Sequence, residues 1–206
     1  MQDAGLVERA SGFHPWDAMS PAALSAILKR GPFRSTVETG CGGSTIVLSH
    51  GSERHKAFAI DGKDRTISAL RLQSDLRIER VGFVEGETKD TLPHYRFEGE
   101  VDLVLLDGPH AYPLTQLEFA YLFPRIRSGG WLVMDDIQIP SVYELFQFLK
   151  KESSVVLEEV VVRTAFFRRV GAVEGGPDGW ELQGINRHTV LRYSWRDRIR
   201  RLLMHR

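Results

Sequence analysis

Three carboxylates and one histidine follow two apolar segments of the chain. Asp107 comes directly after the run VDLVLL and is followed by Gly-Pro-His110, while Asp135 and Asp136 end the run WLVM. In an open parallel sheet, ligands bind beyond the carboxyl ends of the strands. Acids that meet there repel one another unless a cation lies between them. Since all-oxygen ligation suits magnesium, calcium or manganese rather than zinc, the sequence predicts a divalent-cation site at Asp107, Asp135 and Asp136.

Such a site could perform acid–base chemistry on a hydroxyl group. A bound metal ion acts as a Lewis acid that lowers the pKa of a coordinated hydroxyl. A histidine can accept the released proton near neutral pH, so Asp107 and His110 are the candidate catalytic residues. Three alternatives stay open: Asp107 caps the next helix or contacts a cofactor without metal, Asp136 is a helix N-cap, and His110 is a structural histidine.

A glycine-rich segment, ETGCGGST, lies between the first predicted strand of the sheet and a helix. Glycines let the backbone turn sharply and let a ligand come close, and this makes Gly40, Gly42 and Ser44 candidate cofactor-binding residues. Thr45 stands where the dinucleotide pattern G-x-G-x-x-G has its third glycine, which argues against NAD. Glu38 precedes the loop and suits a ligand with an ammonium group rather than a pyrophosphate.

Two further segments complete the predicted cofactor site. Asp61 ends the strand KAFAID, where it could accept hydrogen bonds from two ribose hydroxyls. Gly86, Glu87 and Thr88 follow the next strand and could flank a base. An ammonium group, a ribose and an adenine together describe S-adenosylmethionine. The alternatives are that Asp61 caps the following helix and that Glu87 is a solvated loop acid.

The order of elements predicts an α/β fold with a Rossmann-like, seven-stranded, mostly parallel sheet, helices on both faces and an antiparallel edge strand. Apolar strands alternate with amphipathic helices, which is typical of a parallel sheet covered on both faces. The β-favouring segment 154–170 is broken only near Arg163 and Thr164, so we expect an antiparallel pair there. The predicted helices are 21–30, 44–50, 63–75, 112–126 and 141–151, and the other strands are 35–40, 56–61, 77–86, 101–108 and 131–136.

From about residue 37 to 170 the chain resembles the class I S-adenosylmethionine-dependent methyltransferases. The resemblance rests on ETGCGGST, AFAID, FVEGET, VDLVLLDGPHAY and SGGWLVMDD, in that order. It is strongest to the metal-dependent O-methyltransferases of the macrocin and catechol types. The resemblance implies that Asp107, Asp135 and Asp136 hold Mg²⁺ or another divalent cation. It makes His110 the general base, as in the macrocin type, where the catechol type has a lysine. The glycine loop and the N-terminal helices depart from the catechol type, so its acceptor pocket is not carried over.

Composition sets the remaining expectations. The length of 206 residues predicts one domain over 1–206, with an N-terminal helical extension (1–32) and a basic C-terminal helix (187–206). The net charge of zero argues against a nucleic-acid partner. The absence of a long apolar run argues against a membrane span, and Cys41 as the only cysteine favours a cytoplasmic location. We expect an O-methyltransferase acting on a hydroxyl of a small molecule such as a sugar or natural product. The alternatives are a metal-independent methyltransferase and a cofactor-binding protein without catalysis, and the basic tail leaves a homodimer open.

Overall fold

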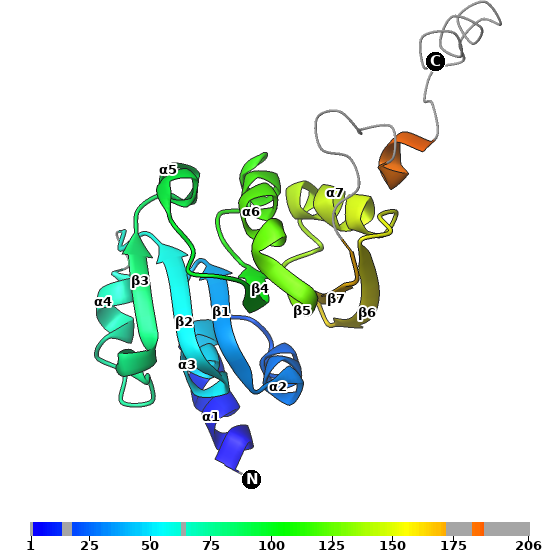
Figure 1. The fold of residues 1–206 in the computed structure, drawn as a ribbon. Coiled ribbons are helices and arrows are strands. Elements are labelled where there is room, and N and C mark those ends of the chain that lie inside the picture. Colours follow the sequence, from blue (N-terminus) through cyan, green and yellow to red (C-terminus); the bar gives the residue numbers. More distant parts are fainter. Residues whose placement is uncertain (1, 14–17, 63–64, 172–182, 188–206) are drawn as a thin grey trace, which may run out of the picture.

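A seven-stranded sheet runs through the computed structural model, which describes residues 2–13, 18–62, 65–171 and 183–187 (Figure 1). The strand order is β3-β2-β1-β4-β5-β7-β6. The strands are β1 (Phe33–Thr39), β2 (Ser52–Ala59), β3 (Val81–Glu85), β4 (Val101–Leu106), β5 (Ile126–Met134), β6 (Val155–Val161) and β7 (Thr164–Arg169).

The strand directions confirm the predicted Rossmann-like sheet. Strands β1 to β5 pair in parallel, whereas β7 runs antiparallel to both β5 and β6. The order reverses between β1 and β4, because β2 and β3 lie on one side of β1 and the later strands lie on the other. This reversal is the topological switch point at which open α/β sheets bind ligands.

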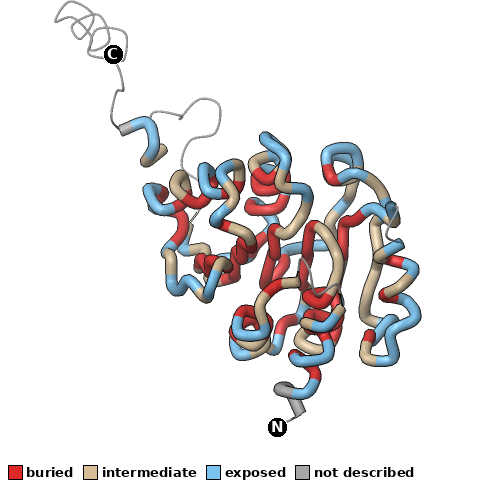
Figure 2. Tube along the Cα trace, turned by 180° about the vertical axis from the view of Figure 1, so that it is seen from behind, coloured by how far each residue is buried: buried red, intermediate tan, exposed pale blue. Residues whose placement is uncertain are grey.

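Helices cover both faces of the sheet, as predicted. One layer holds α1 (Gln2–Ser11), α2 (Pro21–Arg30), α3 (Gly43–Gly51) and α4 (Thr66–Leu70), and the other holds α5 (Thr88–Thr91), α6 (Leu114–Leu122) and α7 (Pro140–Leu149) (Figure 1). The central strands are buried between these layers (Figure 2). Every residue of β4 is buried, because Val104 and Leu106 pack on one layer and Leu103 and Leu105 on the other.

An acid within the apolar run of β4 has a structural partner at the amino end of the strand. Asp102 accepts hydrogen bonds from the backbone amides of Arg34 (2.7 Å) and Ser35 (3.0 Å), and Arg127 Nε lies 2.5 Å from its other oxygen. Asp102 therefore joins the starts of β1 and β4 at the end of the sheet opposite Asp107.

Some element boundaries differ from the sequence predictions. Of the described residues in the helix expected over 63–75, only Thr66–Leu70 are helical; they bury Ile67 and Leu70, whereas Leu72 beyond them is 85% exposed. A helix this short depends on its buried face for stability. The strand expected over 77–86 begins with a 3₁₀ turn and is extended only over Val81–Glu85. Helix α1 lies within the N-terminal helical extension expected over 1–32, and its Leu6, Val7 and Ala10 join the core.

The basic C-terminal helix predicted over 187–206 lies, apart from Arg187, outside the described residues. Among the described residues no helix is both long and apolar enough to cross a membrane.

Candidate active site

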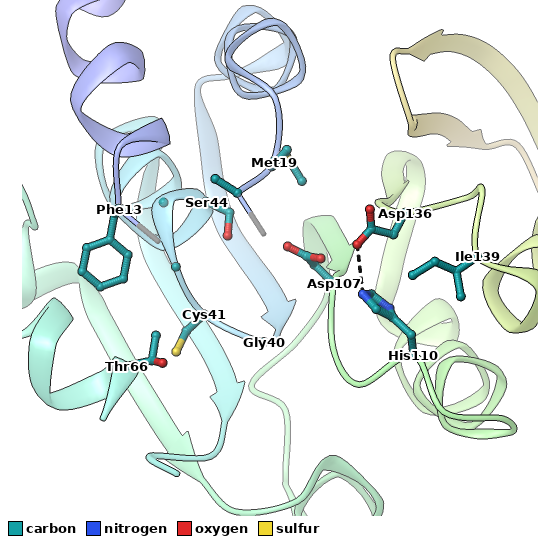
Figure 3. Close-up of a pocket in the computed structure, with 13 residues that line it drawn as sticks. Phe13, Met19, Gly40, Cys41, Ser44, Thr66, Asp107, His110, Asp136 and Ile139 are labelled. Atoms are coloured by element: carbon teal, nitrogen blue, oxygen red, sulfur yellow. Dashed lines mark ion pairs between the residues drawn. The ribbon is translucent and has the colours of Figure 1, made fainter. Parts of the chain in front are cut away.

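Two adjoining cavities lie at the carboxyl ends of the parallel strands, one of about 540 Å³ and one of about 420 Å³. Both are lined by Gly40, Cys41 and Thr66, so the glycine loop forms their common wall. The larger cavity contains the predicted catalytic side chains (Figure 3). The smaller contains the predicted base-binding segment Gly86-Glu87-Thr88.

The acid–base cluster forms in the larger cavity. Asp107 follows β4, His110 lies in the loop after it, and Asp136 follows β5; Figure 3 shows Asp136 and His110 facing each other with Asp107 beside them. His110 Nε2 lies 3.0 Å from Asp136 Oδ2. Ligand atoms of all three residues lie within 4.8 Å of one another, which is close enough to share one metal ion.

Asp135 is not part of this cluster. Its carboxylate is 1% exposed and accepts a hydrogen bond of 2.5 Å from Thr164 Oγ1 on β7. Asp136 has a φ of +55°, and this turn of the backbone gives the two neighbouring acids different partners. Of the predicted metal ligands, the structure thus brings Asp107 and Asp136 together with His110. The other oxygen of Asp135, Oδ2, is buried without a hydrogen-bond partner among the described residues.

A cation that sequence reasoning missed lies beside these acids. Arg163, in the turn between β6 and β7, has its Nε 2.8 Å from Asp136 Oδ1 and 3.9 Å from Asp135 Oδ2. Its Nη2 donates to the carbonyl of Ala18, 2.9 Å away, in a segment that lines the larger cavity. Arg163 therefore offsets part of the negative charge and links the hairpin to the cavity wall.

The remaining negative charge is unfavourable in this environment. Burial raises the pKa of Asp107 well above its ordinary value, and the charges of Asp135, Glu38 and Asp136 raise it further. Burial is also the main cause that raises the pKa of Asp135. Carboxylates in this condition are stabilised either by protons or by a metal cation.

Other residues occupy the N-cap positions that were the alternative roles of Asp107 and Asp136. The N-cap position of α6 is Pro113 and that of α7 is Ile139, so neither Asp107 nor Asp136 caps a helix. His110 is partly exposed to the cavity, and the hydroxyl of Ser141 donates a hydrogen bond to its carbonyl oxygen.

The glycine loop is held from below by Glu38. This buried carboxylate accepts hydrogen bonds from Ser44 Oγ (2.7 Å) and Thr45 Oγ1, and His55 Nε2 lies 3.0 Å away. The Thr45 hydroxyl also accepts from the amide of Gly42, 2.9 Å away. The threonine that replaces the third glycine of the dinucleotide pattern therefore braces the loop. Glu38 is not among the residues that line either cavity, so its predicted contact with an ammonium group stays a prediction.

Gly40 and Gly42, with Ser44, line the larger cavity as predicted for the loop. Gly40 has a φ of +81°, and a Cβ there would lie 2.2 Å from the carbonyl oxygen of Asp107. Only glycine fits this close approach of the loop to the end of β4. The same contact places the loop directly beside the first residue of the acid–base cluster.

Asp61 has a local partner in the structure. It accepts hydrogen bonds from the hydroxyl and the amide of Ser68, and these lower its pKa. Ser68 lies in the first turn of α4, whose N-cap position is Arg65, so Asp61 holds the start of this helix without being its N-cap. Asp61 is absent from the linings of both cavities, although its charge contributes to raising the pKa of Cys41. Its predicted contact with a ribose therefore stays a prediction.

The only cysteine of the chain lies in the wall shared by the cavities. Burial raises the pKa of Cys41 to about 12, with the charges of Glu38 and Asp61 adding to the effect. This shift favours the protonated thiol at neutral pH, and because the thiolate is the reactive form, it disfavours a nucleophilic role for Cys41.

The base-binding segment differs in exposure along its length. Glu87 is exposed and forms an ion pair with Lys89, as expected for a solvated loop acid, but it also lines the smaller cavity. Thr88 is buried, and its hydroxyl donates to Glu118 Oε1 over 2.7 Å.

Glu118 is the second functional candidate that sequence reasoning missed. It lies on the buried face of α6 with Thr115, Phe119 and Leu122, and its side chain is almost fully enclosed. An acid at a core-facing position of an amphipathic helix is the signal that could have found it. Burial raises the pKa of Glu118 to about 7, although the hydrogen bonds from Thr88 and Thr39 oppose the shift.

This raised pKa predicts a pH-dependent effect of Glu118→Gln on stability. An acid whose pKa is higher in the folded than in the unfolded state lowers the stability of the fold as the pH rises. For Glu118 this loss runs from its ordinary pKa of 4.5 to its folded-state pKa of about 7. The full cost is about 3 kcal/mol. Relative to wild type, the glutamine variant should gain about this much unfolding free energy between pH 4.5 and pH 8 in urea titrations. Stability curves that stay parallel over this range would contradict the burial effect.

Known proteins share this architecture. Residues 37–137 match the family described as "Methyltransferase domain". Similar solved structures include cofactor-bound Rv0187 from MTB (19% identity, 82% of this chain and 88% of that one, TM-score 0.63). They also include TomG from Streptomyces achromogenes, an O-methyltransferase involved in tomaymycin synthesis, in complex with SAM (17%, 83% and 91%, TM-score 0.61). A third is the O-methyltransferase from Bacillus cereus in complex with SAH (16%, 82% and 91%, TM-score 0.60). No curated protein is similar enough to the sequence to count as a match.

Proposed function

We propose that this chain is an S-adenosylmethionine-dependent methyltransferase that methylates a hydroxyl group of a small molecule with the help of a divalent cation. The observation that carries the proposal is the convergence of Asp107, Asp136 and His110 in a cavity whose wall is the glycine loop. O-methyltransferases among the similar structures, including one of natural-product synthesis, support a hydroxyl acceptor of that kind.

The two cavities suit the two halves of S-adenosylmethionine. The smaller cavity has an apolar wall at Phe58 and Leu114 with Thr88 at its edge, which fits an adenine ring. The larger cavity offers the glycine loop and leads to the acid–base cluster, which fits the methionine half and its sulfonium. In this arrangement Glu38 acts through Ser44 and Thr45 rather than by direct contact. Asp61 keeps lone pairs for a ribose beside its bonds to Ser68.

The acids fit a divalent cation. Asp107 and Asp136 offer carboxylate oxygens in the cavity, and the buried Oδ2 of Asp135 lacks a hydrogen-bond partner among the described residues. One arginine beside three carboxylates leaves an excess of negative charge, which a divalent ion would offset. We propose that Asp107, Asp135 and Asp136 hold Mg²⁺ or a similar ion. When bound, such an ion supplies Lewis-acid polarisation of the acceptor hydroxyl.

His110 is then the residue that removes the proton. Its ring borders the cavity, and Nε2 lies 3.0 Å from Asp136 Oδ2. A nitrogen that donates to a carboxylate cannot also accept a proton, so Nε2 would act as the base with the Asp136 carboxylate turned to the cation and the acceptor hydroxyl in its place. Met19 and Ile139 contribute apolar side chains to the lining of the same cavity. The chain's main contribution is to hold oxygen, methyl carbon and sulfur in line.

A chelator experiment tests this proposal. Methyl transfer from radiolabelled S-adenosylmethionine would be measured against a panel of phenols, catechols and sugars, before and after treatment with EDTA. We expect transfer to a hydroxyl acceptor, its loss with EDTA and its recovery on adding Mg²⁺. A rate that resists chelation would overturn the metal requirement and favour the metal-independent alternative, for which the ion pair between Arg163 and Asp136 already provides a positive charge.

A further inference from the structure

Glu118 lies behind the smaller cavity, where three segments of the proposed cofactor site meet. These segments are the end of β1, the start of α5 after β3 and the loop after β4, and they bring Thr39, Thr88 and Gly108, respectively, to the carboxylate. Helix α6 supplies Glu118 from the layer behind them, and α5 and α6 lie side by side at this end of the sheet (Figure 1).

Both oxygens of the carboxylate are used. Oε2 accepts a hydrogen bond from Thr39 Oγ1 (2.8 Å), and Oε1 accepts one from Thr88 Oγ1 (2.7 Å). The Thr39 hydroxyl in turn accepts from the amide of Asp107, 3.3 Å away. One buried side chain therefore connects the end of β1, the base-binding segment and the first residue of the acid–base cluster.

Gly108 is fitted to this carboxylate. A Cβ on Gly108 would lie 2.5 Å from Glu118 Oε1 and 2.9 Å from Oε2, so any larger residue would displace the acid or the loop. Gly108 and Thr88 both line the smaller cavity, whereas Glu118 stands one layer behind them. A shift of Glu118 would consequently move two walls of that cavity.

A buried carboxylate at this position lowers the stability of the fold. Glutamate is rarely buried without a charged partner, and its two partners here are neutral hydroxyls. Apolar side chains would pack the α6 interface without that cost. Perturbed acids of this kind concentrate at functional sites. We propose that Glu118 is a positioning residue that sets the cofactor affinity of the site by holding Thr39, Thr88 and Gly108 in place.

The inference rests on the proposed cofactor site, and binding of the product SAH tests it. Isothermal titration calorimetry would compare wild type with Glu118→Ala, Glu118→Gln and Thr88→Val. Losing buried charge-assisted hydrogen bonds should weaken SAH binding about tenfold in the alanine variant. The glutamine variant, which keeps the length and one acceptor, should recover most of the affinity. Thr88→Val should also weaken binding, and combining it with Glu118→Ala should add little, since both changes break one network.

A matched control separates positioning from general stability. Glu152 is another buried glutamate; it follows α7 and accepts a hydrogen bond from the amide of Ile185 rather than from a cofactor loop. Glu152→Gln should change the melting temperature but keep the SAH affinity within about twofold of wild type. If the folded Glu118 and Thr88 variants bind SAH as wild type does, the inference is wrong while the proposed function stands. A wild-type protein that binds no SAH would overturn both.

Discussion

Replacing Asp107 by asparagine is expected to lower methyl transfer about a thousandfold. The substitution keeps the size of the side chain and removes the charge that the proposed cation and acceptor need. Lewis-acid stabilisation is worth several kcal/mol, and a thousandfold loss corresponds to about 4 kcal/mol of barrier. The same variant should be at least as stable as wild type, because Asp107 is enclosed near the charges of Asp135, Asp136 and Glu38. Activity and stability should thus change in opposite directions.

Initial rates with radiolabelled S-adenosylmethionine and melting temperatures of the two proteins check this expectation. The matched control is Asp102→Asn at the amino end of the same strand. Asp102 holds two backbone amides and an ion pair with Arg127, so this variant should lose stability and keep its activity in the folded state. An Asp107→Asn protein with a normal rate would remove Asp107 from the mechanism. A cofactor-binding protein without catalysis would show no turnover to lose in either form.

Removing the histidine is the second change with a large expected effect. General-base catalysis contributes roughly 10² to 10⁴ in rate, so His110→Ala should lose that factor in kcat. SAH affinity should stay close to wild type, because the ring of His110 contacts Asp136 rather than the base-binding segment. His110→Lys should retain part of the activity and shift its optimum to higher pH, because a lysine accepts a proton only at more alkaline pH.

The comparison of kcat with SAH affinity distinguishes a base from a structural residue. If His110 only holds Asp136, its loss should disturb the cluster and lower metal-dependent transfer equally at every pH, and the lysine variant should bring no rescue. If it removes the proton, small external bases such as imidazole should restore part of the rate in the alanine variant. Equal activity of wild type and His110→Ala would contradict the proposed role.

The fold and the location of the site were predictable because they follow from hydrophobic pattern and strand order. The apolar runs that end β4 and β5 had to lie in a covered parallel sheet, and acids at their carboxyl ends had to meet at one edge. That logic placed Asp107, Asp136 and His110 in one cavity. It could not tell which of Asp135 and Asp136 faces the cavity, because the directions of these adjacent side chains depend on the left-handed backbone at Asp136.

What the sequence did not reveal are contacts made by residues far apart in the chain. Arg163 reaches Asp136 only because the β6–β7 hairpin returns beside β5. Glu118 reaches Thr39 and Thr88 only once α6 has packed behind three loops. Such partners have no fixed spacing from the residues they hold, so no local pattern indicates them.

The most direct test of the account is to find where a divalent cation binds. Crystals of the full chain would be soaked with SAH and Mn²⁺, and the anomalous scattering of manganese would be mapped. We predict a single strong peak at the larger cavity, within about 2.2 Å of oxygens of Asp107, Asp135 and Asp136 and near His110, with SAH along the glycine loop. Crystals that hold SAH but show no manganese at these acids would contradict the central claim.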